Sequence, residues 1–141
     1  MPTSTSPQNV LYTANVHTTG GRDGRSRSDD GRLDLQLSSP GSSGAGTNPE
    51  QLFAAGWSAC FEGAMQLAAR RQNLKLPDNV AIDAQVDLCL AEGNYFLQAR
   101  LKISVPGLER ALVQALVDAA HHTCPYSKLS RNNIHVDITV A

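Results

Sequence analysis

The chain has 141 residues, of which 41% are hydrophobic and 18% are charged, and its formal net charge is −1 at pH 7. This length fits one domain with a packed core, and the composition excludes global disorder. The near-neutral charge provides no general attraction to nucleic acid or to an anionic membrane. Three cysteines are too few for a disulfide scaffold, and an odd number cannot all pair within one chain.

The N-terminal residues 1–9 are rich in Ser, Thr and Pro, and they predict a flexible tail ahead of a single domain over residues 10–141. The tail has neither the basic start nor the apolar stretch of a secretory signal peptide. The uncharged apolar stretch 51–61 is too short to cross a bilayer. We therefore expect a cytoplasmic protein without a membrane partner, in a compartment where thiols are mostly reduced.

Two strands and two loops are expected before residue 48. Residues 10–16 predict a first strand, whereas residues 18–31 contain four glycines, show no periodicity and predict a loop. Residues 33–37 alternate between apolar and polar side chains, which is typical of a half-buried strand. A second loop, rich in Gly and Ser, follows over residues 38–48.

A long helix is predicted from Pro49 to about Gln72. Asn48 can cap its free N–H groups, Pro49 suits the first helical position, and Glu50 suits the positive end of the helix dipole. Small or apolar residues lie on nearly all sides of its first half, so we expect this helix to be buried on most sides. A chain of this size has little else to cover it, and a partner chain would do so.

The second half of the chain predicts a hairpin, a helix and a strand. Residues 80–90 and 97–105 alternate and indicate an antiparallel hairpin with one solvated face. Residues 108–119 have the spacing of an amphipathic helix, which Pro125 ends, and residues 134–140 alternate as a last strand. Together the elements predict an α+β fold with antiparallel sheets and helices packed on one face.

The three cysteines lie in unlike surroundings. Cys60 lies inside the long helix and Cys124 follows the second helix, and each could be a reactive thiol or a small core residue. Cys89 alternates onto the polar face of its strand, and we expect it to have no role. His121, His122 and Cys124 lie close together, but no metal-binding motif completes a site, so no metal is expected.

The basic residues do not form a nucleic-acid surface. Four arginines fall between residues 22 and 32, but aspartates offset them and no aromatic residues lie between them. The glycine-rich segment 19–24 has neither the dinucleotide-binding nor the phosphate-loop spacing, so no nucleotide cofactor is expected.

Several segments together carry a family resemblance. They are Leu-Tyr-Thr-Ala at 11–14, Thr-Gly-Gly-Arg-Asp-Gly-Arg at 19–25, Thr-Asn-Pro-Glu-Gln-Leu-Phe-Ala-Ala-Gly at 47–56, Ser-Ala-Cys-Phe at 58–61, Pro-Gly-Leu-Glu-Arg at 106–110 and His-Thr-Cys-Pro-Tyr-Ser at 122–127. In this order they resemble the OsmC/Ohr family, and specifically its organic hydroperoxide resistance branch. The resemblance covers the chain from about residue 10 to its end.

The resemblance implies an intertwined α+β homodimer with a long buried central helix and two active sites at the subunit interface. It implies a thiol peroxidase, without a cofactor, that reduces organic hydroperoxides, including those of fatty acids. Cys60 matches the family's peroxidatic cysteine and Cys124 its resolving cysteine, while Arg22 and Glu50 match the residues that support the reactive thiol. The expected reductant is a dithiol, the dihydrolipoyl group of a lipoylated protein.

The chemistry of a thiol peroxidase explains why these four residue types would act together. Burial alone would raise the pKa of Cys60, whereas the guanidinium of Arg22 would favour the thiolate and Glu50 would hold that arginine in position. A disulfide between Cys60 and Cys124 would then prevent irreversible over-oxidation of Cys60. Ten positions along one helix separate Glu50 from Cys60 by roughly 15 Å, so we expect one of the two to come from the other chain.

Two positions depart from the family pattern, namely Trp57, where Tyr is more common, and Glu62, where an apolar residue is expected. The aromatic residues Phe53, Trp57 and Phe61 are expected to form an apolar wall near Cys60 that favours hydrocarbon-bearing peroxides. The alternative is a non-catalytic module on the same fold that binds a small ligand or a metal through His121, His122 and Cys124.

Overall fold

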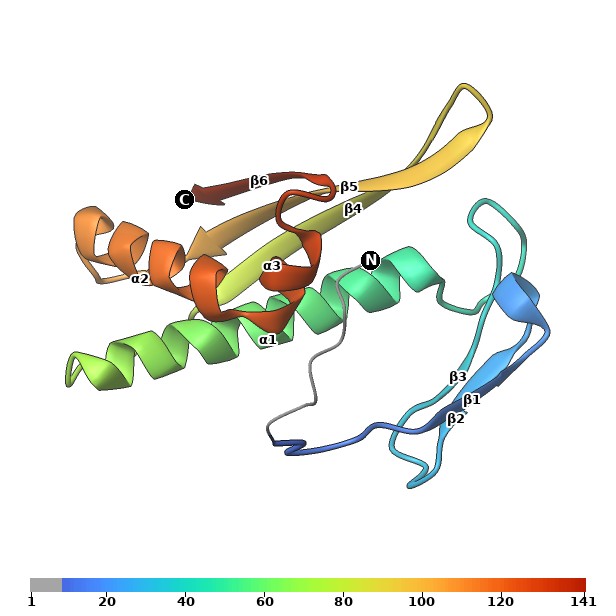
Figure 1. Cartoon of the computed structure of the whole chain (residues 1–141), viewed down its shortest axis with the longest axis horizontal. Coiled ribbons are helices and arrows are strands. Elements are labelled where there is room, and N and C mark those ends of the chain that lie inside the picture. The colour runs from blue at the N-terminus through green and yellow to red at the C-terminus, as the bar shows by residue number, and fades with distance from the viewer. Residues whose placement is uncertain (1–8) are drawn as a thin grey trace. The chain divides into compact units, whose positions relative to one another are not determined.

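The structure, a computed structural model, describes residues 9–141. The chain divides into two compact units, one that ends at Asn48 and one that spans Pro49–Ala141 (Figure 1). Apart from Asn9, the tail expected at residues 1–9 lies outside the described residues. The single domain expected over residues 10–141 stays a prediction.

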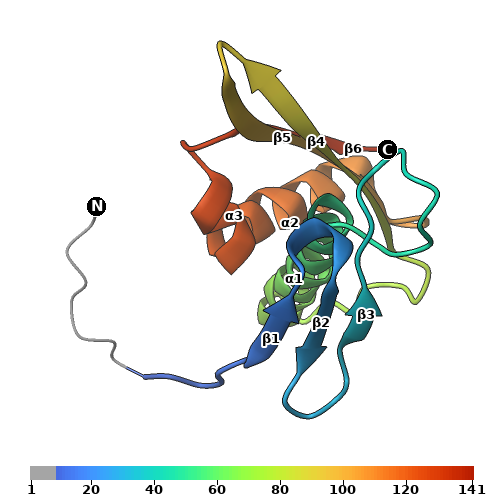
Figure 2. The same cartoon turned by 90° about the vertical axis from the view of Figure 1, so that its right-hand side faces the viewer.

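The first unit is a small antiparallel sheet in the order β1-β2-β3 (Figure 2). Its strands are β1 (Val16–Thr19), β2 (Arg25–Ser28) and β3 (Asp34–Gln36), and a short 3-10 helix, η1 (Gly21–Asp23), connects the first two. All three strands are short, with three or four residues each.

Two expectations for this unit are wrong. The strand expected over residues 10–16 begins only at Val16, and the loop expected over residues 18–31 contains both η1 and β2. The sequence of β2, Arg-Ser-Arg-Ser, has no apolar alternation, because this strand is held by ladder hydrogen bonds to both neighbours and buries only the small side chain of Ser26. The chain turns tightly around η1, where Gly20 has a φ of 74° and a Cβ on Gly24 would collide with the carbonyl group of Thr19.

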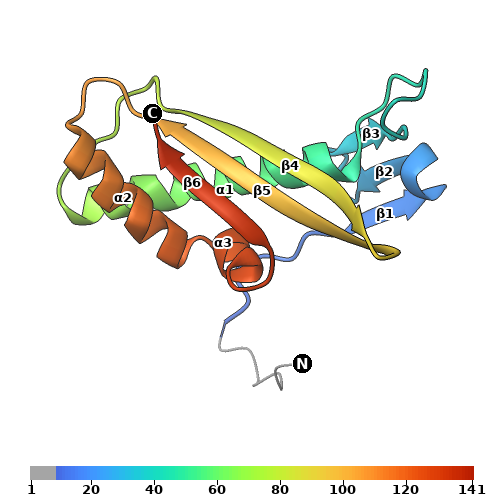
Figure 3. The ribbon, with the colours of Figure 1, turned by 90° about the horizontal axis from the view of Figure 1, so that it is seen from above.

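The second unit packs helices against one face of a three-stranded sheet in the order β4-β5-β6 (Figure 3). Its elements are α1 (Pro49–Arg71), β4 (Ala81–Ala91), β5 (Asn94–Ser104), α2 (Arg110–Thr123), α3 (Pro125–Ser130) and β6 (His135–Val140). The predicted helix start at Pro49 and the β4–β5 hairpin are confirmed. The two sheets with their helices make an α+β fold, as predicted.

The last strand differs from the prediction in its direction. β6 pairs with β5 in parallel, whereas the sequence pattern was interpreted as antiparallel throughout. After β5 the chain passes through α2 and α3 before β6 begins, and such a helical crossover brings the next strand back in the same direction. Alternation of apolar residues marks a strand but does not reveal the direction of its partner.

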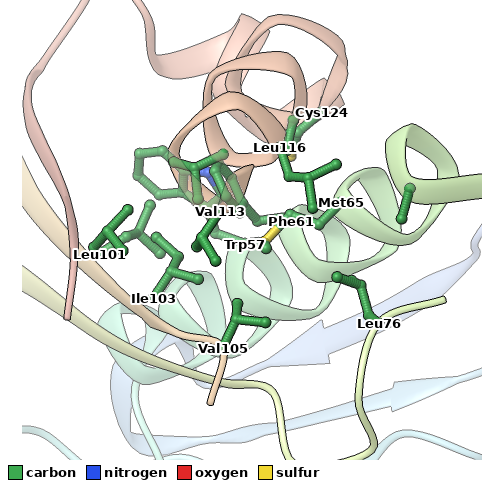
Figure 4. Close-up of a cluster of buried hydrophobic side chains, with 14 of the residues drawn as sticks. Trp57, Phe61, Met65, Leu76, Leu101, Ile103, Val105, Val113, Leu116 and Cys124 are labelled. Atoms are coloured by element: carbon green, nitrogen blue, oxygen red, sulfur yellow. The ribbon is translucent and has the colours of Figure 1, made fainter. Parts of the chain in front are cut away.

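The core of the second unit forms along one stripe of α1. Trp57, Phe61, Met65 and Ala69, spaced four residues apart, are buried, and they pack with side chains of β5 and α2 (Figure 4). The main partners from these two elements are Leu101, Ile103, Val113, Leu116 and Val117. Fully burying one such large apolar side chain stabilises a fold by about 1.5–3 kcal/mol.

Another side of α1 is exposed within the single chain. Ala55, Ala59 and Gly63, also four residues apart, are exposed. One chain therefore leaves part of α1 uncovered, as expected for a helix that a partner chain completes, and its burial on most sides stays a prediction. No helix within residues 9–141 is both long enough and apolar enough to cross a membrane.

A polar network lies on the solvated face of the hairpin. Arg100 of β5 donates two hydrogen bonds to the carboxylate of Asp87 on β4, at 2.9 and 3.0 Å, and Gln98 donates a third at 2.7 Å. These bonds, above all those from Arg100, lower the pKa of Asp87 from 3.8 to about 2. The carboxylate of Asp87 thus stays ionised in the folded protein at pH values where the unfolded chain takes up a proton.

We expect this network to make stability depend on pH in a defined window. Because the folded pKa of Asp87 is lowered, its contribution is present above the unfolded pKa of 3.8 and is lost as the pH falls toward about 2. Urea unfolding between these pH values should show a flatter pH dependence in Asp87→Asn than in the unchanged protein. Asp83→Asn, an exposed carboxylate on the same strand, is the control, and identical pH profiles for Asp87→Asn and the unchanged protein would contradict the assignment.

Candidate active site

The two cysteines of interest meet where α1, α2 and α3 come together. Cys60 lies within α1, and Cys124 lies at the corner between α2 and α3. The residue before a proline is disfavoured in a helix, so Pro125 ends α2 at Thr123 and begins α3. The backbone N–H of Cys124 still donates to the carbonyl oxygen of Ala120 at 2.8 Å, which fixes the corner to the last turn of α2.

The sulfur atoms of Cys60 and Cys124 are 3.3 Å apart, although the residues are 64 positions apart in the chain. Both are free thiols. Since the sulfur–sulfur bond of a disulfide is about 2.05 Å long, they need to approach by only a little more than about 1 Å to become bonded. Cys124 is completely buried, whereas Cys60 is partly exposed, so Cys60 is the more accessible of the two residues.

The surroundings of Cys60 disfavour its reactive form. Burial raises the pKa of its thiol, and the neighbouring thiol of Cys124 raises it further, while a hydrogen bond from the backbone of Tyr126 acts in the opposite direction. Because the thiolate is the nucleophile, a reactive Cys60 requires a positive charge beyond what these neighbours provide.

Aromatic side chains connect α1 and α3 beside the cysteines. The indole N–H of Trp57 donates to Ser127 Oγ at 3.1 Å, and both residues are completely buried. The ring of Phe53 lies 5.4 Å from that of Trp57 and 5.9 Å from that of Tyr126. A Cβ on Gly56 would lie 2.8 Å from the hydroxyl oxygen of Tyr126, so α3 approaches α1 closely at this glycine.

The expected apolar wall needs a correction. Trp57 and Phe61 are completely buried core residues, as Figure 4 shows, and they cannot line an open pocket. The neighbouring rings of Phe53 and Tyr126 are partly exposed. The sequence showed Tyr126 and Ser127 only as members of a motif, and the helical spacing of Phe53, Trp57 and Phe61 did not distinguish core from surface.

The two other predicted site residues, Glu50 and Arg22, lie at the start of α1 and in the first unit. Glu50 is in the first turn of α1, and the helix is continuous from there to Cys60, so roughly 15 Å of helix axis separates the two. Arg22 lies in η1, between glycines with positive φ on one side and Gly24 on the other. Of the four predicted site residues, Cys60 and Cys124 are the pair that the structure brings into contact, through their sulfur atoms.

The remaining candidates lie outside this contact. Cys89 is in β4, opposite Phe96 of β5, and is partly exposed, as the alternation predicted. His121 is half-buried in the last turn of α2, its Nδ1 has no hydrogen-bond partner among the described residues, and burial lowers its pKa. Within residues 9–141 no three His, Cys, Asp or Glu side chains are grouped so that they could hold a metal ion.

Comparison with known proteins identifies relatives over nearly the whole chain. Residues 40–139 match the family model described as OsmC-like protein. The organic hydroperoxide resistance protein of Xanthomonas axonopodis pv. citri is 51% identical over 140 residues, which cover 96% of this chain and 99% of the relative.

Solved structures agree over the same length. The crystal structure of the organic hydroperoxide resistance protein OhrB of Bacillus subtilis superposes with a TM-score of 0.88 at 42% identity, and it covers 94% of this chain and 100% of its own. A putative organic hydroperoxide resistance protein from Vibrio cholerae, with captopril bound in one of its active sites, has a TM-score of 0.88 at 36% identity and covers 94% of both chains. On these matches, the chain belongs to the OsmC/Ohr family.

Proposed function

We propose that this protein is a thiol-dependent peroxidase that reduces organic hydroperoxides to alcohols and thereby contributes to organic hydroperoxide resistance. The observation that carries the proposal is the pair of free thiols at 3.3 Å, one partly exposed and the other buried behind it. Relatives named organic hydroperoxide resistance proteins, at up to 51% identity, support the same assignment. The cytoplasm, where a dithiol reductant is available, is the proposed location.

The proposed reaction consumes two electrons from the two cysteines. The thiolate of Cys60 attacks one peroxide oxygen, the oxygen–oxygen bond breaks, and the leaving alkoxide takes up a proton to become the alcohol. The resulting sulfenic acid is attacked by the sulfur of Cys124, so a sulfur–sulfur bond forms, and the hydroxyl group leaves as water with a proton from the Cys124 thiol. A dithiol, which we propose is a dihydrolipoyl group, then returns both cysteines to thiols by exchange and becomes a disulfide itself.

Cys60 and Cys124 divide these steps according to their exposure. A peroxide that diffuses in from solvent meets the partly exposed Cys60 before the buried Cys124, whose sulfur contacts that of Cys60. Next to Cys60, the partly exposed rings of Phe53 and Tyr126 offer an apolar surface to the hydrocarbon part of a substrate. We therefore propose that organic hydroperoxides are preferred over hydrogen peroxide, which has no apolar part to bind.

Arg22 and Glu50 are proposed to make the thiolate accessible at neutral pH. Burial and Cys124 raise the pKa of Cys60, and a guanidinium favours the charged form because it stays protonated and donates several hydrogen bonds in a fixed geometry. The roughly 15 Å of helix between Glu50 and Cys60 leads us to propose that one of them completes the site of the other chain.

A second copy of this chain is the proposed partner for the exposed side of the second unit. The stripe Ala55, Ala59 and Gly63 on α1 has no bulky side chain, which allows another helix to approach closely. At the far end of the β4–β5 hairpin, Leu90 and Tyr95 are 61% and 72% exposed, although they lie on the face that buries the core elsewhere. Apolar surface of this kind on a small chain marks an interface.

The proposed thiol chemistry is testable by counting the thiols that are lost per molecule of peroxide. We expect one equivalent of cumene hydroperoxide to remove two of the three thiols and to leave Cys89, because only Cys60 and Cys124 are in contact. Cys60→Ser should lose no thiol to this amount of peroxide, and Cys124→Ser should form a sulfenic acid that a second equivalent converts to the sulfinic acid. Thiol titration and mass spectrometry measure each species.

Cys89→Ser is the matched control, and it should lose its two remaining thiols as fast as the unchanged protein. Unchanged thiols in the presence of peroxide, or a disulfide that contains Cys89, would overturn the proposed function. Steady-state turnover with a dihydrolipoyl reductant, run beside glutathione and thioredoxin, then identifies the reductant.

The role of Arg22 is testable by the pH dependence of the first step. Removing the cation in Arg22→Gln should raise the apparent pKa of Cys60, so the rate of thiol loss at pH 7 should fall about tenfold or more for each pKa unit and recover as the pH rises. Arg22→Lys should be intermediate because it keeps the charge but not the fork of donors. Arg25→Gln, an exposed arginine of the same unit, is the control, and a pH profile in Arg22→Gln that matches the control would refute the role.

The homodimer is testable by mass and by complementation. Sedimentation should give twice 15.1 kDa, and Gly63→Arg should shift the protein toward the monomer, while Gln114→Arg on the exposed face of α2 should not. Mixing Glu50→Ala and Cys60→Ser chains should restore about a quarter of the activity, since half of the dimers are mixed and each holds one complete site. No recovery in verified mixed dimers would show that both residues act from one chain.

A further inference from the structure

A buried hydrogen bond ties α1, which carries Cys60, to α3, which begins directly after Cys124. Trp57 Nε1 of α1 donates to Ser127 Oγ of α3 at 3.1 Å, and both side chains are completely buried although they are 70 positions apart in the chain. Buried N–H and hydroxyl groups are nearly always paired, so this bond is costly to leave unmade and holds its two elements in one arrangement. Unlike the apolar contacts around it, the bond has a preferred direction and distance.

The bond lies beside the thiol contact. Trp57 precedes Cys60 by three residues on α1, and Ser127 follows Cys124 by three residues at the start of α3. Residues three apart are neighbours on a helix surface, so Trp57 and Cys60 are neighbours on α1. The nitrogen–oxygen contact of 3.1 Å joins α1 to α3, and the sulfur–sulfur contact of 3.3 Å joins α1 to the residue directly before α3. Figure 4 shows Trp57 and Cys124 within one buried cluster.

The resolving element needs such a restraint. α3 has only six residues and is separated from α2 by the bend at Cys124, and a hydrogen bond from Arg131 Nη1 to the carbonyl oxygen of His121 at 2.8 Å ties its C-terminal end back to α2. Phe53 and Gly56 contact Tyr126 on the same short helix, but a stacked ring pair and a close approach at a glycine allow sliding. The hydrogen bond of Trp57 restricts the remaining freedom.

We propose that the Trp57–Ser127 hydrogen bond is a positioning clamp for disulfide formation, holding Cys124 within reach of the sulfenic acid of Cys60. The proposal rests on the proposed function and concerns its second step. That step forms the sulfur–sulfur bond, breaks the sulfur–oxygen bond of the sulfenic acid and releases water with the proton of Cys124. It competes with a second peroxide, which would convert the sulfenic acid to the sulfinic acid.

Because disulfide formation competes with over-oxidation, the position of Cys124 can be assessed from the ratio of disulfide to sulfinic acid. A misplacement of about 1 Å can cost about a hundredfold in the rate of a step that depends on close approach. Attack of Cys60 on the first peroxide requires no movement of Cys124, so the clamp does not contribute to it. Loss of the clamp should therefore slow resolution, leave the first step unchanged and increase over-oxidation, which loss of packing alone would not do.

The test compares two ways of removing the bond. Ser127→Ala removes the acceptor, and Trp57→Phe removes the donor while keeping an aromatic ring in the core. In stopped-flow with excess cumene hydroperoxide, we expect oxidation of Cys60 within about twofold of the unchanged protein and disulfide formation about ten- to a hundredfold slower. Mass spectrometry should then show a sulfinic fraction approaching that of Cys124→Ser.

Two further variants separate positioning from general loosening. Ser127→Thr keeps the hydroxyl and should restore most of the resolution rate. Ser130→Ala removes another buried hydroxyl of α3, which donates only within its own helix, to the carbonyl oxygens of Tyr126 at 2.9 Å and Ser127 at 3.3 Å. This variant should leave both rates unchanged. Trp57 is the only tryptophan, so its emission spectrum verifies the folded state and the lost hydrogen bond in Ser127→Ala.

The outcomes are distinguishable. If the unchanged protein does not react with the hydroperoxide, the proposed function fails. If the unchanged protein forms the disulfide and folded Ser127→Ala or Trp57→Phe forms it equally fast, the clamp is refuted and the function stands. An equal slowing in Ser130→Ala also refutes the clamp, because it shows that any loosening of α3 has the same effect.

Discussion

The contact between the sulfur atoms of Cys60 and Cys124 is the constraint on which the second unit depends. A separation of 3.3 Å between residues 64 positions apart requires α1 and the corner after α2 to be held to within about 1 Å. The buried stripe of α1, packed against α2 and β5, provides the rigid frame. Pro125 then turns the chain so that Cys124 faces α1 rather than continuing along α2.

The same burial that aligns the thiols works against their chemistry. A buried Cys124 is protected from solvent oxidants, and burial raises the pKa of the Cys60 thiol, so the second unit by itself places the two sulfur atoms well but disfavours the thiolate of Cys60. A positive charge resolves this conflict, and the cation proposed for it, Arg22, lies in the other unit.

One side of α1 is left uncovered in the single chain. Ala55, Ala59 and Gly63 repeat at the same four-residue interval as the buried stripe, and they lack the charged or bulky side chains of an ordinary solvated helix face. The end of the β4–β5 hairpin likewise exposes apolar side chains. In the proposed dimer, one association would bury both surfaces and bring together Glu50 and Cys60 of different chains.

Local signals determined the strongest parts of the prediction. The α+β class and the family follow from features of consecutive residues. These features are the helix start around Pro49, the alternation of the hairpin and the family motifs that contain Cys60 and Cys124. Tertiary structure decided the rest, because it depends on partners far apart in the chain. Examples are the parallel pairing of β6, the β2 strand held by its neighbours, and the bond from Trp57 to Ser127, whose spacing of 70 positions no periodicity reveals.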